Sequence, residues 1–409
     1  MSSSQSPTCP VQLGVDGDIM SLMKQVYLDN NATTPMDPEV FETMRSYYVE
    51  DFGNASSIHL HGQRARSAVE DARTQVAELI GAKAKEIVFT SGGTESDNTA
   101  VRGVAAQHLS RGDHIITSTI EHSAVLRSCE HLEEKGLKVS YVPVDRHGIL
   151  RLDRFEKALT EQTVLVSIIH GNNEIGVIQP ITQLVEIARQ HNLLFHTDAV
   201  QTVGKIPICV SELAVDLLAL SAHKFHGPKG VGALYVRGET SLQPLLFGGS
   251  QERSRRAGTL DVPGIVGLGK ACELAGQALE NLNSRVRKLR DRLEAGILQQ
   301  IPDTVVNGCR ENRLPHITNI SFRGLDGEAL LISLDFQGVA VSTGSACSSG
   351  SIEPSHVLTA LGGDQKLRDS AIRFSLSRMT TESDIGYILQ ILPKIVQRMR
   401  EVSPLYQTG

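Results

Sequence analysis

The stretch "VDLLALSAHKFHGPKGVGALYVR", residues 215–237, decides the fold. It holds two apolar runs, 215–222 and 232–237, separated by a short segment of basic residues and glycines. Apolar residues occupy consecutive positions in both runs, as is typical of strands that are buried on both faces of a sheet. Two lysines, Lys224 and Lys229, lie between the runs. The stretch therefore predicts two buried strands with charged side chains just beyond the end of the first.

Runs of the same kind recur upstream and alternate with helical patterns. The other predicted strands are 86–91, 114–119, 139–144, 163–169 and 193–199. Helical patterns lie between several of them, for example in residues 95–109 and 180–192. This alternation predicts an α/β fold with a mainly parallel, seven-stranded sheet that is covered by helices. Ligands of such folds bind at the carboxyl ends of the strands.

The alternation stops near residue 262, and the rest of the chain mixes strands with helices. A helical pattern spans 263–300, and a closing helix is predicted to begin near Thr381, which has capping-box spacing to Asp384. We predict three parts: a polar, disordered N-terminal extension at 1–24, a large cofactor-binding domain at 36–262, and a smaller α+β domain formed by 25–35 and 263–409.

Composition and charge exclude several classes of function. The 409 residues carry a formal net charge of −6, so neither nucleic acid nor an anionic membrane is an expected partner. No apolar run approaches the roughly 18 residues that a membrane span needs, and the first 24 residues resemble neither a signal nor a transit peptide. The six cysteines include no C-x-x-C pair, so neither a zinc site nor a disulfide framework is expected. We expect a cytoplasmic protein.

Two strand ends carry residues suited to a phosphorylated cofactor. The segment "TSGGTESDN" (90–98) joins a strand to a helix, and its glycines and unpaired helix N–H groups make Gly93 and Thr94 candidates for binding phosphate. The alternative is an ordinary glycine turn that Thr94 caps. In "HTDAVQ" (196–201), Asp198 is either a helix cap or a ligand contact. An acid at this place suits the pyridine nitrogen of pyridoxal phosphate (PLP).

Basic residues complete the candidate site. A buried lysine at a strand end can form a Schiff base, and spacing leaves both Lys224 and Lys229 open, with Lys224 nearer the strand. His122, just beyond another strand, fits a helix cap as well as a catalytic group. Arg373 fits either an exposed ion pair or the paired hydrogen bonds of a carboxylate. Together with the phosphate cradle and Asp198, these are the parts of a PLP enzyme that acts on an amino acid.

Cys347 lies in "STGSACSSGS" (342–351), a run of serine and glycine that suits neither a packed core nor a stable helix. A thiol in such a setting stays accessible and can react. We predict that residues 342–354 form a mobile loop of the smaller domain.

From "VYLDNNATTP" at residue 26 to "VSPLY" at 402–406, the chain resembles the cysteine desulfurases of the NifS/IscS group, which are class-V aminotransferase-like members of the fold-type-I PLP-dependent transferases. The resemblance rests on "FTSGGTESDN", "NNEIGV", "HTDAVQ", "HKFHGPKGVGALYVR", "RAGT" and "GSACSSGSIEPSHVL", in the family's order. It implies an enzyme that converts L-cysteine to L-alanine and leaves a persulfide on Cys347. The sulfur would then pass to an iron–sulfur scaffold or another acceptor protein.

The resemblance also implies a role for each site residue. Lys224 would bind PLP as a Schiff base, Asp198 would face its pyridine nitrogen, and Gln201 would reach its phenolic oxygen. His122 would stack on the ring and transfer protons. Cys347 would accept the sulfur and is a candidate for a transient iron–sulfur ligand shared with a scaffold, although no resident metal is implied. The other implied contacts are Gly93, Thr94, Ser221 and His223 with the phosphate, Thr259 with the phosphate of the partner subunit in a homodimer with shared active sites, Asn173 with cofactor and substrate, and Arg373 with the substrate carboxylate.

Three alternatives stay open. A selenocysteine lyase or cysteine sulfinate desulfinase of the same fold would differ in substrate preference, and another aminotransferase-like enzyme would need an α-keto acid. A scaffold without catalysis would lack Lys224, Asp198 or Cys347, and all three are present. Because the sequence ends three residues after Tyr406, where IscS-type members usually carry a longer tail, we expect the NifS-like branch, with nitrogenase clusters as one destination of the sulfur.

Overall fold

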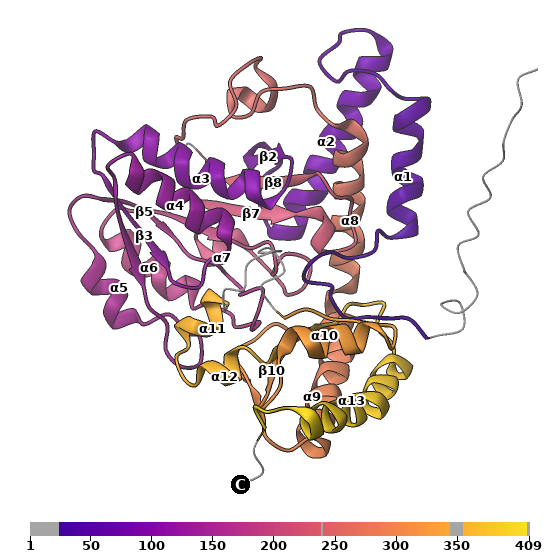
Figure 1. The fold of residues 1–409 in the computed structure, drawn as a ribbon. Helices are drawn as coiled ribbons and strands as arrows, with labels where there is room; N and C mark the ends of the chain where they lie inside the picture. The colour runs from indigo at the N-terminus through magenta and orange to yellow at the C-terminus, as the bar shows by residue number, and fades with distance from the viewer. Residues whose placement is uncertain (1–23, 239, 344–354, 407–409) are drawn as a thin grey trace, which may run out of the picture.

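The computed structural model describes residues 24–238, 240–343 and 355–406. Figure 1 shows a large sheet with helices on its two faces and, below it, a smaller part in which helices pack on short strands. None of the helices in the described ranges is long and apolar enough to cross a membrane.

The large sheet contains the strands that the sequence predicted. These are β2 (Ile87–Thr90), β3 (His114–Ser118), β4 (Lys138–Val142), β5 (Thr163–Ser167), β6 (Leu194–Asp198), β7 (Leu217–Ser221) and β8 (Gly232–Val236). Their order is β2-β8-β7-β6-β5-β3-β4. Neighbouring strands are parallel except for β8, which runs antiparallel to β2 and β7. The predicted mainly parallel, seven-stranded sheet is therefore confirmed.

Helices cover both faces of this sheet. They are α1 (Pro38–Val49), α2 (Leu60–Ile80), α3 (Gly93–His108), α4 (Ser123–Glu134), α5 (Leu152–Ala158), α6 (Ile181–Gln190), α7 (Val210–Leu213) and α8 (Val262–Asn281), with 3-10 turns η2 (Ala84–Glu86), η3 (Ala222–Lys224) and η4 (Gln251–Ser254). Leu217 of β7 packs in a core with α3 and α4, whereas Leu218 packs in a core with α2 and α8. Consecutive strand residues face opposite layers, so both must be apolar.

The smaller part combines two short sheets with helices. The strands β1 (Val26–Tyr27) and β11 (Val339–Ala340) pair in parallel, and β9 (Thr304–Val306), β10 (Ile317–Phe322) and β12 (Ala371–Ser375) form an antiparallel sheet in the order β12-β10-β9. The helices are α9 (Arg287–Gln300), α10 (Gly327–Asp335), α11 (His356–Ala360), α12 (Gln365–Arg368) and α13 (Glu382–Val402). Thr381 and Asp384 form the predicted capping box at the start of α13.

A long helix connects the two parts. The helix α8, a π-helical turn η5 (Leu282–Val286) and α9 follow one another without a gap, which confirms the predicted helical pattern. Leu274 of α8 packs in the core with α2, whereas Leu293 of α9 packs in the core of the smaller part. The predicted domain division after residue 262 stays a prediction, and this packing favours a division at η5.

Candidate active site

Side chains from the strand ends line one cavity of about 310 Å³. It lies at the carboxyl ends of the parallel strands, where ligands of such folds bind. The predicted site residues that line it are Gly93, Thr94, His122, Asn173, Asp198, Gln201, Ser221, His223, Lys224 and Arg373. Thr259 is exposed and is not among the lining residues, and Cys347 lies outside the described residues.

The turn between β2 and α3 forms an anion cradle. Gly92 has a φ of 148°, which other residues rarely adopt, and α3 begins at Gly93. A Cβ on Gly93 would lie 2.6 Å from Cγ2 of Val200, so no larger residue fits there without a shift of the neighbouring loop. The first N–H groups of a helix lack partners within it and carry the positive end of its dipole. The start of α3 therefore fits a phosphate group.

Lys224 lies in the turn η3, directly after β7. Its Nζ donates hydrogen bonds to two backbone carbonyl oxygens, that of Asn31 at 2.6 Å and that of Ala32 at 3.0 Å. Lys229 is exposed and does not line the cavity. Of the two lysines that the sequence left open, the structure therefore brings only Lys224 to the cavity.

Asp198 is a buried acid at the end of β6. It is 4% exposed, and its Oδ1 accepts a hydrogen bond from the backbone N–H of Val200 at 2.9 Å. Burial raises the pKa of Asp198, against the opposing effects of His122 and Lys224. A positive charge favours the ionised form of a carboxyl group. A protonated pyridine nitrogen beside Asp198 would therefore offset the effect of burial.

Asp97 of α3 is a second buried acid, which sequence reasoning missed. Ligand atoms of Asp97, His122 and Asp198 all lie within 4.8 Å of one another. Oδ1 of Asp97 is 3.5 Å from Nε2 of His196. Burial raises the pKa of Asp97 well above its usual range, and Asp198 and Glu121 add to this effect. Burial also lowers the pKa of His196 to about 3. Burial thus favours the uncharged form of both Asp97 and His196.

His122 is both a helix cap and a cavity residue. It precedes α4, and its Nδ1 accepts a hydrogen bond from the backbone N–H of Ala124 at 3.2 Å. Nδ1 is thus the unprotonated nitrogen, and Nε2 is the nitrogen that would carry a transferable proton. Of the two roles that the sequence left open, the cap is observed and the position suits catalysis as well.

Gln201 joins the cavity to the N-terminal segment 29–34. Its Nε2 donates to the backbone carbonyl oxygen of Asn31 at 3.0 Å, the same oxygen that accepts from Lys224. Its Oε1 is buried and has no hydrogen-bond partner among the described residues. A bound group with a hydroxyl would satisfy this oxygen, and this fits the predicted contact with the phenolic oxygen of PLP.

Arg373 lies on β12 and is 2% exposed. Its Nη2 donates to Oδ1 of Asp29 at 2.7 Å, and its Nη1 donates to the backbone carbonyl oxygen of Asn173 at 3.0 Å. Its Nε has no partner among the described residues. Two of the five N–H groups of the guanidinium thus hold Arg373 beside the cavity, where a planar cation of this kind suits a carboxylate.

Three residues of the site escaped the sequence analysis for different reasons. Asp97 follows Gly93 by one helical turn and lies on the buried face of α3. The other residues of this face are mostly small or apolar, so an acid among them was the sequence signal that could have indicated a site residue. Asp29 and Asn31 lie in the polar run that follows β1, and no local pattern connects that run to the strand ends.

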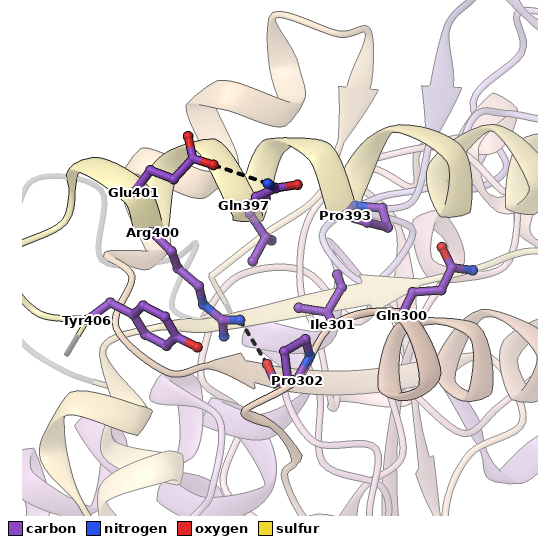
Figure 2. Close-up of a pocket in the computed structure, with 9 residues that line it drawn as sticks. Gln300, Ile301, Pro302, Pro393, Gln397, Arg400, Glu401 and Tyr406 are labelled. Carbon is purple, nitrogen blue, oxygen red and sulfur yellow. Dashed lines mark hydrogen bonds between the residues drawn. The ribbon is translucent and has the colours of Figure 1, made fainter. Parts of the chain in front are cut away.

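A larger hollow of about 510 Å³ lies elsewhere, between the end of α9 and α13, and Figure 2 shows its lining. None of the predicted site residues that the structure describes lines it. Arg400 donates to the carbonyl oxygen of Pro302 at 2.8 Å and stacks over Tyr406, while Gln397 donates to Glu401. These groups are already bonded to one another, so size alone does not make this hollow the active site.

Comparisons with known proteins agree with this geometry. Residues 26–388 match the aminotransferase class-V family. The cysteine desulfurase IscS of Dictyoglomus turgidum is 52% identical over 386 residues, which cover 94% of this chain and 98% of that protein. A cysteine desulfurase of Trichormus azollae is 50% identical over 383 residues, 93% of this chain and 95% of that one. A solved NifS-like protein superposes with a TM-score of 0.87 at 41% identity and covers 92% of this chain and 100% of its own.

The fold and the cavity are those of a class-V aminotransferase, a class of enzymes that depends on PLP. Within this class, the chain belongs to the cysteine desulfurase family. The residues fit the cofactor, since the start of α3 suits its phosphate, Asp198 its ring nitrogen and Lys224 its aldehyde carbon.

Proposed function

We propose that this chain is a cysteine desulfurase that moves the sulfur of L-cysteine to the thiol of Cys347. The observation that carries the proposal is the joint presence, in one cavity, of Lys224, Asp198 and the guanidinium of Arg373. A lysine and an acid for PLP beside a binding group for a carboxylate suit an amino acid substrate.

The proposed reaction balances without an external oxidant or reductant. L-cysteine and the Cys347 thiol become L-alanine and a Cys347 persulfide. The C–S bond of the substrate breaks, an S–S bond to Cys347 forms, and the β-carbon of the substrate gains the proton that the thiol loses. PLP, when bound, withdraws electrons from the substrate's α-carbon and so makes the neighbouring bonds easier to break. The persulfide then passes its sulfur to an iron–sulfur scaffold or another acceptor protein.

The residues of the chain hold and orient the reacting groups. Lys224 would hold the cofactor, and His122 would move protons at its Nε2. Gly93, Thr94, Ser221 and His223 would bind the phosphate. Burial, together with the charge of Lys224, lowers the pKa of His223 to about 4. Before phosphate binds, His223 is therefore uncharged at neutral pH, and an imidazole N–H can donate a hydrogen bond to the phosphate.

The described ends of the segment that contains Cys347 support its role as acceptor. Ser342 pairs with Arg373, whose backbone N–H donates to the carbonyl oxygen of Ser342 at 2.7 Å. On the other side, Oγ of Ser355 donates to Oε2 of Glu174 at 2.5 Å, next to Asn173 of the cavity. The chain thus leaves and re-enters the described structure beside the residues proposed to hold the substrate.

We propose further that the active enzyme is a homodimer, in which the partner subunit's Thr259 completes the phosphate site. Large apolar side chains are exposed on α1, at the start of α2 and between them: Phe41, Tyr48, Val49, Phe52, Ile58 and Leu60. An apolar surface of this kind suits a second copy of the chain. Sedimentation should give two copies per particle, and a fully active monomer would contradict this part of the proposal.

We also propose that the enzyme acts in the cytoplasm. The four cysteines among the described residues are free thiols, as is usual where thiols stay reduced. A persulfide carrier needs such an environment, because an oxidising one would pair the acceptor thiol in a disulfide.

The test is release of alanine and sulfide from L-cysteine in the presence of a reducing thiol. Wild type should turn over, whereas Cys347→Ala and Lys224→Ala should lose activity by at least about 100-fold because each removes a group that reacts. The matched controls are Cys309→Ala and Lys229→Ala, which remove the same chemical groups outside the cavity. If Cys347→Ala kept the wild-type rate, Cys347 would not be the acceptor, and turnover of selenocysteine should be measured next.

A further inference from the structure

Lys205 is a buried amine to which the proposed reaction gives no role. It lies in the loop after β6 and is 3% exposed. Its Nζ is 3.1 Å from Nε2 of His316, the residue that precedes β10. Among the described residues, the effects on its charge are burial first and then the charge of Lys224. Both disfavour the protonated amine.

The hydrogen bonds of His316 fix the direction of this contact. Nδ2 of Asn31 donates to the carbonyl oxygen of Asn173 at 2.8 Å, so Oδ1 is the atom of Asn31 that faces His316, at 3.0 Å. Because Oδ1 only accepts, Nε2 of His316 carries the hydrogen. Nε2 then cannot accept from Lys205. Its contact with Lys205 is a hydrogen bond only if Nζ accepts a share of the one Nε2 hydrogen that also points to Oδ1 of Asn31, and only the uncharged amine has a lone pair to do so.

The surroundings of Lys205 agree with an uncharged amine. Among the described residues, the neighbouring charges that act on Lys205 or His316 are those of Lys224, Arg290 and Arg373, and all three are basic. His223, His226 and Arg378 also lie near Lys205, and the acid Asp37 is paired with Arg378. Burial and Lys224 lower the pKa of Lys205 to about 7. Burial also lowers the pKa of His316 well below its usual range.

Asn31 connects this pair to the proposed cofactor lysine. The side chain of Asn31 is held at one end by Asn173 and at the other by His316. Its backbone carbonyl oxygen accepts from Nζ of Lys224 at 2.6 Å and from Nε2 of Gln201 at 3.0 Å. The backbone N–H of Asn31 donates to Oγ of Ser375 at 3.0 Å, so His316 is one of the contacts that position the oxygen that holds Lys224.

We propose that Lys205 is a positioning residue: as an uncharged amine it shares the Nε2 hydrogen of His316 with Oδ1 of Asn31, holds the imidazole ring in place against Asn31, and so helps to position the carbonyl oxygen that holds Lys224 in the cavity. This inference deepens the proposed function and rests on Lys224 as the residue that binds PLP. Protonation of Lys205 sets a positive charge against the Nε2–H group and breaks the contact.

The first test measures the ionisation of Lys205 through stability, in protein without substrate. An ordinary lysine in the unfolded chain holds its proton up to a pH of about 10.4, whereas folded Lys205 loses it near 7, so wild type gains stability as pH rises through this window. Melting temperatures are compared at pH 7 and pH 9 for wild type, Lys205→Met and the exposed control Lys229→Met. Wild type and Lys229→Met should gain a few degrees relative to Lys205→Met. If the difference in melting temperature between wild type and Lys205→Met were the same at pH 7 and pH 9, the proposal would be overturned.

The second test separates an acceptor from a cation. PLP binding is measured for Lys205→Gln, whose Oε1 can accept from His316, for Lys205→Met, which cannot accept, and for Lys205→Arg, which is always charged. Lys205→Gln should bind PLP within about twofold of wild type and Lys205→Met about fivefold more weakly, the usual cost of one hydrogen bond. If Lys205→Arg bound PLP as tightly as wild type, while Lys205→Gln and Lys205→Met bound it more weakly, Lys205 would act as a cation. This result would overturn the proposal.

If the Lys205 variants do not fold, NMR of wild type with labelled lysines decides the question. One lysine signal, distinguished from that of Lys224 by the Lys224→Ala variant, should titrate near neutral pH. Titration of all lysines near 10 would overturn the proposal. None of these readouts uses turnover of L-cysteine, so an inactive wild type would refute the proposed function by a separate result.

Discussion

The cavity has two walls that are built differently. The strand-end wall, represented by Gly93, His122 and Asp198, uses side chains and a helix start that follow directly after strands. The segment wall, formed by Asn31 and Ala32 of the N-terminal run, uses backbone carbonyl oxygens as acceptors, and the carboxylate of Asp29 in the same run holds Arg373. Both walls are mostly buried, but the first contains acids whose pKa burial raises, and the second holds the basic residues of the site.

The difference between the two walls shows that ionisable groups lie in one wall of the site, whereas the groups that hold other side chains in place lie in the other. The strand-end wall offers groups that can change their protonation state at the reacting atoms. The carbonyl oxygens of the segment wall bind Lys224 without adding a negative charge, so they fix the amine without forming an ion pair with it. Changes in the first wall should therefore lower kcat, and changes in the second should mainly alter binding.

The largest effect is expected for Asp198→Asn in the strand-end wall. Asparagine keeps the shape and can still accept from Val200, but it cannot carry the negative charge that would face the ring nitrogen of PLP. We expect kcat to fall by about 100-fold or more, as for the loss of one preorganised electrostatic contact. Steady-state kinetics at saturating PLP measure this effect. A kcat within twofold of wild type would show that the strand-end wall does not supply this charge.

An intermediate effect is expected for Asp29→Ala in the segment wall. The change removes the carboxylate that holds Nη2 of Arg373, so the guanidinium loses a charge-assisted hydrogen bond that fixes it at the cavity. We expect KM for L-cysteine to rise about tenfold, with a smaller change in kcat, in keeping with the usual strength of such a bond. Asp29→Asn, which can still accept, should lie between Ala and wild type. A fall in kcat at unchanged KM would contradict the expectation that changes in the segment wall mainly alter binding.

The two walls also differ in how far the sequence predicts them. Each residue of the strand-end wall follows an apolar run within a few positions, and parallel strands bring their carboxyl ends to one edge, so local patterns were enough. The segment wall depends on a backbone carbonyl oxygen, which every residue has, and on contacts such as Lys224 with Asn31, which are 193 residues apart. Spacing alone likewise left Lys229 open, whereas the family resemblance implied Lys224, and the structure brings that lysine to the cavity.

The smallest effect is expected for Asp97→Asn, although Asp97 lies beside Asp198. Burial already favours the protonated, uncharged form of Asp97, so an uncharged amide of the same shape should change kcat at pH 7 by less than about twofold. In the unfolded chain the same carboxyl group ionises near pH 4, so wild type loses stability as pH rises above 4, and the variant lacks this loss. The melting temperature of Asp97→Asn minus that of wild type should therefore increase from pH 4 to pH 8. A fall in kcat as large as that of Asp198→Asn, with no such trend in stability, would mean that Asp97 is ionised and shares the chemistry of its neighbour.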